Sequence, residues 1–352
     1  MLDYIIVGCG LAGISFAETL IANNKSFIVI NDDSQCSSKV AAGTYNPIIL
    51  KRFSSVWHAK QQLDVLDSFY PNLEQKIKVK LDYKLPVYRK LVSVEEQNNW
   101  FAASDKPLVS EYLSNELIKT KFNHIDSPFG FGKVLKTGFV DTKLLLVNYE
   151  KYLISQNLLI KETFDYSKIA QNADSVSYKT LKSKHIIFAE GFGMNQNPYF
   201  NYLPLDGTKG ELLLIKAPDL NLDVILNSSL YIVPFGFQMY KVGATYEWDD
   251  KTNSPTENGL NELLTNLKAI INCDFEIIEH LAGIRPTVKD RRPLVGTHPR
   301  HKNFHVFNGL GTRGVMIAPE LAKVLFNHIE NNESLDEYVD IKRFQKFCPN
   351  LD

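Results

Sequence analysis

The chain has 352 residues, enough for two domains, and its hydrophobic share of 44% and charged share of 22% are ordinary for a soluble globular protein. Its 39 Lys and Arg residues against 40 Asp and Glu residues exclude a general electrostatic attraction to nucleic acid or to an anionic membrane. The longest apolar runs are far short of the ~20 residues that a membrane-spanning helix needs.

The first expected elements are a buried strand over Tyr4 to Val7 and a helix over Ile14 to Ala22, joined by the pattern G-x-G-x-x-G. The first glycine allows the tight turn, the second lets the backbone approach a pyrophosphate, and the third lets helix and strand lie close. The helix N-terminus offers free N–H groups to the phosphates. The turn therefore predicts a dinucleotide site that includes Gly8, Gly10, Leu11, Ala12 and Gly13.

The second strand, Phe27 to Ile30, should end in an acid that hydrogen-bonds the ribose. Asn31 stands directly after the strand and Asp32 one residue later, so either Asn31 makes this contact or a shifted strand end brings Asp32 to it. No Lys or Arg stands at this strand end to hold a 2′-phosphate, which disfavours NADP.

A polar loop over Ser34 to Lys39 is expected next. The small residues Ala41, Ala42 and Gly43 follow it and let the chain lie against a cofactor. An amphipathic helix is predicted over Val56 to Phe69, ended by Pro71.

Lysines alternate with apolar residues in the stretch Lys76 to Lys90, which predicts a strand with one solvent-exposed face. Six basic residues with two tyrosines in this stretch are also compatible with an RNA-binding surface. The other interpretation is that the lysines protect an exposed strand from edge pairing.

The middle of the chain predicts a helix over Thr142 to Ser155, capped by Asp141, and strands over Leu158 to Phe164 and Lys184 to Ala189. The last strand ends in a second turn of small residues, and in an open parallel sheet ligands collect at such carboxyl ends. We assign Ala189 and Gly191 to the cofactor site.

The sequence pattern changes from Leu203 onward, with long runs typical of β-strands over Glu211 to Lys216, Leu230 to Pro234 and Met239 to Thr245. These runs predict an antiparallel sheet and therefore a second domain of a different class. A helix is expected over Leu260 to Asn272.

The C-terminal region repeats the strand, glycine turn and helix order, with a strand over Phe304 to Phe307 and a helix over Ile317 to Ile329. A cofactor with a pyrophosphate at one end and a large ring elsewhere uses two such turns, the second helix N-terminus facing the anionic edge of the ring. This favours FAD. The second turn contributes Gly309, Gly311, Thr312, Arg313, Gly314 and Val315.

The four cysteines are scattered without a C-x-x-C pair, which argues against a structural zinc site and fits a reducing cytoplasm. We therefore expect a cytoplasmic protein without a metal site. The cysteines are Cys9, Cys36, Cys273 and Cys348.

Nine motifs, in order and over nearly the full length, resemble the FAD-dependent D-amino-acid oxidase superfamily, in the branch with glycine oxidase and sarcosine oxidase. They are GCGLAG at 8–13, AAG at 41–43, HIIFAEG at 185–191, KGELL at 209–213, YIVP at 231–234, VGATYEWD at 242–249, AGIRP at 282–286, DRRPLVG at 290–296 and NGLGTRGVMIAP at 308–319. The stretch GLGTRG is closer to the flavin domain of the bifunctional bacterial protein that processes carboxymethylaminomethyl-uridine in tRNA. Residues 54–135 match no motif.

The resemblance implies an α/β fold, α+β overall, with a Rossmann-like FAD-binding domain built from separated segments and an antiparallel-sheet substrate domain. We expect the FAD-binding domain over residues 1–79, 136–205 and 285–352. The substrate domain then takes residues 80–135 and 206–284.

The resemblance also implies oxidation of the C–N bond of a small amine or amino acid that carries a carboxylate, with hydride transfer to flavin N5 and electrons passing on to O2 or another acceptor. Arg285 matches the arginine that grips the carboxylate, and its planar, permanently charged fork suits that role. Tyr231 matches the tyrosine that shares the carboxylate in glycine oxidase. Lys241 matches the lysine beside the flavin that promotes O2 reduction in sarcosine oxidase.

Two departures from the family pattern lead to further expectations. No cysteine follows Arg285 and Pro286, where sarcosine oxidase attaches its flavin, so we expect non-covalent FAD. Relative to glycine oxidase, the arginine of the last glycine turn is displaced by one residue, so Arg313 can point elsewhere. The alternatives are a flavoenzyme that acts on carboxymethylaminomethyl-uridine in tRNA and a non-catalytic FAD-binding subunit.

Overall fold

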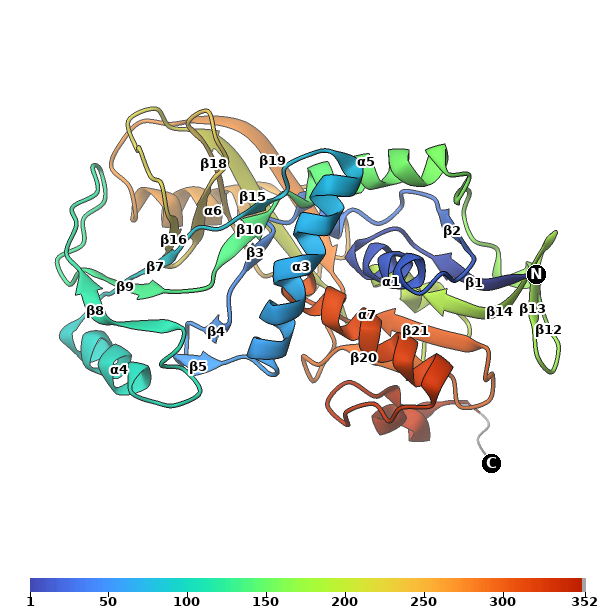
Figure 1. Ribbon diagram of the computed structural model, residues 1–352. Coiled ribbons are helices and arrows are strands. Elements are labelled where there is room, and N and C mark those ends of the chain that lie inside the picture. The colour runs from blue at the N-terminus through green and yellow to red at the C-terminus, as the bar shows by residue number, and fades with distance from the viewer. Residues whose placement is uncertain (350–352) are drawn as a thin grey trace.

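The structure is a computed structural model that describes residues 1–349, and its strands form two large sheets of eight strands each (Figure 1). In the first sheet, β1 lies between β2 and β14, and β11, β2, β1, β14 and β21 run parallel. Strands β12, β13 and β20 add antiparallel pairs. The strands of this sheet are β1 (Leu2–Val7), β2 (Phe27–Asn31), β11 (Leu159–Lys161), β12 (Ile169–Gln171), β13 (Val176–Tyr178), β14 (Leu181–Phe188), β20 (Leu294–Thr297) and β21 (Phe304–Asn308).

The second sheet has the order β19-β15-β18-β17-β16-β7-β9-β8 and confirms the predicted antiparallel sheet. All of its pairs are antiparallel except β16 with β7. Its strands are β7 (Val87–Lys90), β8 (Leu113–Ile118), β9 (Phe131–Val134), β15 (Thr208–Lys216), β16 (Ile225–Asn227), β17 (Tyr231–Pro234), β18 (Met239–Gly243) and β19 (Glu276–Arg285).

Helices α1 and α7 pack on the first sheet, and α4 and α6 pack on the second. Helices α1, α3 and α7 lie together near the centre of the molecule in Figure 1. The helices are α1 (Leu11–Ala22), α2 (Ser37–Val40), α3 (Ala59–Ile77), α4 (Val94–Ser104), α5 (Thr142–Ser155), α6 (Glu257–Lys268) and α7 (Gly314–Asn331), with 3-10 turns η1 (Tyr166–Lys168), η2 (Gly191–Gln196) and η3 (Ile341–Phe347). Short strands complete the fold: β3 (Thr44–Tyr45), β4 (Ile48–Ile49), β5 (Ser54–Ser55), β6 (Asp82–Tyr83) and β10 (Gly138–Val140).

The predicted strand–turn–helix units at both ends of the chain are confirmed. Strand β1 is buried on both faces from Tyr4 to Val7, as the apolar run indicated. Helix α5 begins after Asp141, whose carboxylate accepts a hydrogen bond of 3.0 Å from the backbone N–H of Leu144, the expected N-cap. Helices α1 and α7 pack against each other, which brings the two chain ends together.

Two local predictions are wrong. Ser37–Val40 forms the short helix α2, which overlaps the loop predicted over Ser34 to Lys39 and packs against Gly283 of β19. Pro71 does not end its helix: α3 continues to Ile77 with Pro71 inside it. Tertiary contacts outweigh the lost helical hydrogen bond, since Tyr70 is buried and its hydroxyl donates 2.8 Å to the carbonyl of Val315.

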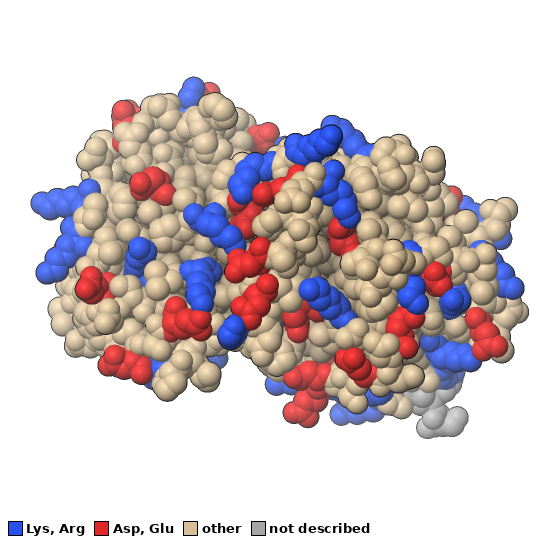
Figure 2. All heavy atoms as spheres, in the orientation of Figure 1, with Lys and Arg blue, Asp and Glu red and all other residues tan. Residues whose placement is uncertain are grey.

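The predicted strand over Lys76 to Lys90 is also wrong. Lys76 lies in the last turn of α3 and pairs with Glu18, and the chain then forms only β6 and β7. Four of the six basic residues that suggested an RNA surface have acidic partners: besides Lys76, Lys80 pairs with Glu74, Lys84 with Asp67 and Asp82, and Arg89 with Glu96. On the face shown in Figure 2, blue and red side chains are interspersed.

The fold class is confirmed as α/β with a separate antiparallel sheet. Strands of the first sheet lie in 1–79, 136–205 and 285–352, and those of the second lie in 80–135 and 206–284, except that β19 continues one residue further to Arg285. The division into two domains stays a prediction. Residues 350–352 of the last segment lie outside the described residues. Among residues 1–349, no helix combines the length and apolar character needed to cross a bilayer.

Candidate active site

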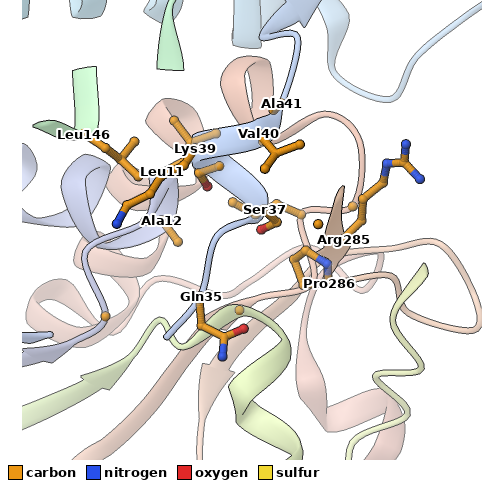
Figure 3. Close-up of a pocket in the computed structure, with 18 of the residues that line it drawn as sticks. Leu11, Ala12, Gln35, Ser37, Lys39, Val40, Ala41, Leu146, Arg285 and Pro286 are labelled. Atoms are coloured by element: carbon orange, nitrogen blue, oxygen red, sulfur yellow. The ribbon is translucent and has the colours of Figure 1, made fainter. Parts of the chain in front are cut away.

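A cavity of about 620 Å³ runs between the two sheets. One side is lined by the β1–α1 turn, the end of β2, the following loop and the turn before α7, and the other by strands of the antiparallel sheet. Figure 3 shows Leu11 and Ala12 of α1, Ser37 of α2, and Arg285 with Pro286 around one part of this cavity. Segments nearly 300 residues apart in sequence therefore share one site.

The β1–α1 turn has the geometry of a phosphate-binding turn. Gly8 has φ +102°, and a Cβ there would lie 2.4 Å from the carbonyl oxygen of Ala189. A Cβ on Gly13 would lie 2.0 Å from the carbonyl oxygen of Gly8. Helix α1 has no side-chain cap and no acid in its first turn, so its N–H groups face the cavity ready for an anion.

The start of α7 faces the same cavity. Its N-cap, Arg313, makes no capping hydrogen bond, and Gly314, Val315 and Met316 line the cavity wall. A Cβ on Gly314 would lie 3.1 Å from Leu11 Cδ1, so the two uncapped helix starts are neighbours. Two such N-termini suit a cofactor with a pyrophosphate and an electron-rich ring edge, which fits FAD.

Asn31 and Asp32 both line the cavity at the end of β2. The Asn31 Oδ1 accepts 3.1 Å from the backbone N–H of Cys9 and so braces the glycine turn. The Asp32 Oδ1 accepts 3.0 Å from the backbone N–H of Ser34. Burial raises the pKa of the Asp32 carboxyl, but hydrogen bonds, chiefly those from Ser34, outweigh burial, and the net pKa is lowered. The assignment of the ribose contact to Asn31 or Asp32 stays a prediction.

Arg285 ends β19 at the other end of the cavity. Its Nη1 donates 3.1 Å to the carbonyl of Thr245 and 3.4 Å to that of Lys209, and the guanidinium carbon lies 4.5 Å from the centre of the Tyr246 ring. A Cβ on Gly210 would lie 2.0 Å from Arg285 Nη2, so the glycine leaves the space that the guanidinium group occupies. Burial lowers the pKa of Arg285, and among residues 1–349 it has no acidic partner.

Tyr231 lines the cavity from β17, and burial raises the pKa of its hydroxyl. Arg313 is a charged neighbour of this tyrosine, and its Nη1 donates 3.1 Å to the carbonyl of Asn46. Asn46 also lines the cavity, and its side chain hydrogen-bonds with the Tyr231 hydroxyl, which opposes the effect of burial on the pKa of that hydroxyl.

Lys241 does not line the cavity. It points from β18 to the carbonyl of Ala41, 3.2 Å from Nζ, and its Nζ lies 4.2 Å from the centre of the Phe235 ring. Burial lowers its pKa to about 8. Since Ala41 is part of the cavity wall, the ammonium lies directly behind that wall.

Most of the predicted site residues meet in the cavity, and three do not reach its wall. Besides Lys241, these are Gly13 and Gly309, which permit close packing behind it. The predicted residues that line it are Gly8, Gly10, Leu11, Ala12, Asn31, Asp32, Ala41, Ala42, Gly43, Ala189, Gly191, Tyr231, Arg285, Gly311, Thr312, Arg313, Gly314 and Val315.

Sequence reasoning missed several polar residues of the wall. Glu190 is buried, accepts hydrogen bonds from Tyr166 and Asn197, and burial raises its pKa to about 7. Tyr246 and Asn46 at the substrate end were also missed. The motifs HIIFAEG around Glu190 and VGATYEWD around Tyr246 offered a signal, whereas Asn46 comes from a segment without a motif.

Comparison with known proteins agrees with this geometry. The family model described as FAD dependent oxidoreductase (DAO) matches residues 3–327. Glycine oxidase from Bacillus subtilis (strain 168) is 23% identical over 259 residues, 69% of this chain and 68% of its own length. The bifunctional tRNA 5-methylaminomethyl-2-thiouridine biosynthesis protein MnmC of Idiomarina loihiensis is 28% identical over 153 residues, 41% of this chain and only 25% of its own length.

Solved structures show the same fold. A glycine oxidase from Geobacillus kaustophilus superimposes with a TM-score of 0.77 at 18% identity, covering 97% of both chains. Iminodiacetate oxidase (IdaA) from Chelativorans sp. BNC1 gives a TM-score of 0.79 at 17% identity, covering 97% of this chain and 98% of its own. The family match and the two glycine turns on one cavity together establish that this chain belongs to the DAO family of FAD dependent oxidoreductases, with FAD as its cofactor.

Proposed function

We propose that the protein oxidises the C–N bond of a small amine or amino acid that carries a carboxylate. The supporting observation is Arg285, a charged fork beside the cavity whose only described hydrogen bonds go to two backbone carbonyls. A guanidinium removed from water without an anion is costly, and a substrate carboxylate supplies that anion. Glycine oxidases among the relatives act on a substrate of this class.

The side chains of this end would bind and orient the substrate. Arg285 holds the carboxylate through its free N–H groups, and the Tyr231 hydroxyl, kept neutral by burial, donates a hydrogen bond to the same group. Tyr246 stacks on the guanidinium and limits its movement. Bound FAD supplies the two-electron acceptor for the reaction. The protein needs no strong base when the amine binds neutral, so positioning and charge complementarity are its main contributions.

We propose O2 as the final electron acceptor, with Lys241 as the cation that favours its reduction. The buried ammonium lies behind the wall formed by Ala41, and a fixed positive charge in a dry environment stabilises a developing anion. We also propose that FAD is held without a covalent bond, since Thr287 and Val288 stand where the resemblance places a flavin-linked cysteine. Acid precipitation should then leave the protein pellet colourless.

The four cysteines are unpaired in the described chain, which supports a reducing compartment, and we propose the cytoplasm.

An anaerobic screen tests the proposed function. Purified protein with bound FAD is mixed with single amines and amino acids, and the absorbance of oxidised flavin is followed. At least one carboxylate-bearing amine should bleach the flavin, while the matching amine without a carboxylate should not. A flavin that no amine bleaches would contradict the proposal and favour a non-catalytic FAD-binding subunit.

A further inference from the structure

Two arginines, and not one, face the substrate end of the cavity without an acidic partner. Arg285 and Arg313 both line the cavity, and neither forms an ion pair with any acid among residues 1–349. Other half-buried arginines differ: Arg89 pairs with Glu96 at 2.9 Å, and Arg343 with Asp290 at 2.9 Å. Arg89 and Arg343 thus have a carboxylate beside the guanidinium, whereas the guanidinium groups of Arg285 and Arg313 have only backbone carbonyls as hydrogen-bond partners among the described residues.

The two guanidinium groups belong to adjacent chain segments. The backbone N–H of Gly311 donates 3.2 Å to the carbonyl of Pro286, which joins the turn before α7 to the end of β19. Tyr246 interacts with both charges, since its ring covers Arg285 and its hydroxyl is a charge neighbour of Arg313. Both guanidinium groups therefore lie near the Tyr246 side chain, and both arginines line the same cavity.

Backbone carbonyls accept hydrogen bonds from both guanidinium groups and hold them in place without neutralising their charge. Arg313 Nη1 donates to the carbonyl of Asn46, and Arg285 Nη1 to those of Thr245 and Lys209. Burial lowers the pKa of each guanidinium, the direction expected for a charge that has lost water and gained no anion. One carboxylate satisfies one such fork in a bidentate manner and leaves the second charge uncompensated.

We propose that the substrate carries two anionic groups, an amine with a carboxylate on each side of the nitrogen, of which Arg285 holds one and Arg313 the other. The inference rests on the proposed function for the amine, but the two-anion site is a separate property of the cavity. It explains why the fold tolerates two uncompensated charges at one end of a pocket.

Two matched ligand pairs test this site. Iminodiacetate and sarcosine are both secondary amines, and differ by one carboxylate. Glutarate and butyrate are their unreactive counterparts, with a methylene in place of the nitrogen, and calorimetry measures their binding to the holoprotein. We expect the second carboxylate to improve both binding and the rate of anaerobic flavin bleaching about tenfold or more.

The Arg313→Met variant assigns the effect to this residue. It should bring the ratio of glutarate to butyrate affinity close to one, and Arg313→Lys should restore part of it. Arg292→Met is the matched control, because Arg292 is half-buried, stacks on Tyr338 at 4.3 Å and does not line the cavity. It should leave the ratio unchanged. Flavin content is measured in each variant, so that loss of FAD is not mistaken for loss of the site.

The outcomes separate this inference from the proposed function. Glutarate binding no tighter than butyrate, or an affinity ratio that survives Arg313→Met, would overturn the two-anion site even if sarcosine bleaches the flavin. A ratio that depends on Arg313 while no amine bleaches the flavin would retain the two-anion site and remove the proposed oxidation.

Discussion

The two ends of the cavity are built in different ways. At the cofactor end, glycine turns and uncapped helix starts offer backbone groups, and a side chain at Gly8 or Gly13 would collide with backbone atoms. At the substrate end, side chains from separate strands and turns supply the charge, with Arg285 and Arg313 as the cations. A site built from backbone groups loses binding when a methyl group is added to a glycine, whereas a site built from side chains loses binding when a charge is removed. The predictions below use this difference.

The largest effect is expected at the glycine turn. Gly13→Ala should prevent FAD binding and lower the free energy of unfolding by roughly 3 kcal/mol or more, since its Cβ would lie 2.0 Å from a carbonyl oxygen. At Gly10, a Cβ would meet only the Ser38 hydroxyl at 3.6 Å, so Gly10→Ala should fold normally and weaken FAD binding roughly tenfold. Denaturant unfolding of the apoproteins measures the free energy of unfolding, and FAD titration measures the FAD affinity of each variant. Equal FAD affinity for Gly10→Ala and wild type would contradict the assignment of this turn.

The next largest effect is expected when the charge at the substrate end is removed. Arg285→Met should lower kcat/KM for a carboxylate-bearing amine by roughly a hundredfold or more, chiefly through KM, while flavin content stays constant. Arg285→Lys should recover only part of this loss, because an ammonium cannot form the bidentate pair. Steady-state kinetics with flavin quantification distinguish the cases, and unchanged kinetics for Arg285→Met would refute the carboxylate role.

A smaller effect is expected behind the cavity wall. Lys241→Met keeps the buried volume but removes the charge, and should slow reoxidation of reduced flavin by O2 roughly tenfold. Since burial lowers the pKa of Lys241 to about 8, the wild-type reoxidation rate should decline as pH rises from 7 to 9. Stopped-flow mixing of reduced protein with O2 gives this rate, and anaerobic reduction by substrate is the control. A pH-independent rate that Lys241→Met leaves unaltered would exclude this role.

The smallest effect concerns the stability of the cofactor region in acid. His305 is fully buried; its Nε2 lies 3.0 Å from His185 Nδ1 and its Nδ1 2.9 Å from Thr297, and burial holds its pKa well below 6.5. Below pH 6.5 this histidine is protonated in the unfolded chain but stays neutral in the folded chain. The free energy of unfolding should therefore fall with decreasing pH by up to ~1.4 kcal/mol per pH unit. The effect should start near pH 6.5 and end at the folded pKa.

His305→Gln keeps a polar group at this place and cannot be protonated. It should flatten the pH dependence of the unfolding free energy between pH 6.5 and 5, whatever its effect at pH 8. Chemical denaturation at several pH values provides the comparison. An identical slope in wild type and His305→Gln would show that this histidine does not control acid stability.

The difference between the backbone-built cofactor end and the side-chain-built substrate end also explains which parts could be predicted from the sequence. Glycine spacing in the β1–α1 turn and the Asp141 cap report local backbone geometry, so both were predicted correctly. The Lys76–Lys90 stretch alternates like a strand, but ion pairs with Glu18 and Glu74 fix its first part on α3. These are tertiary contacts, which no local pattern contains.

The substrate end was predictable only in part. Arg285 and Tyr231 came from resemblance to the family, and both line the cavity. Asn46 and Tyr246 were missed because long-range packing, rather than local spacing, brings them to Arg313 and Arg285. Helix α2, predicted as a loop, was missed for the same reason, since it packs against α5 and β19, which are distant in the sequence.

Titration of the apoprotein with FAD tests the central claim, that backbone from both ends of the chain holds one flavin nucleotide. One FAD per chain should bind, with weaker binding in Gly10→Ala at one end and in Gly311→Asn at the other. Gly311 has φ +55°, which Asn tolerates, and its Cβ would meet no atom within 4 Å, so the variant changes the cavity and not the turn. Colourless protein that does not bind FAD, or a variant at either end with wild-type affinity, would contradict the claim.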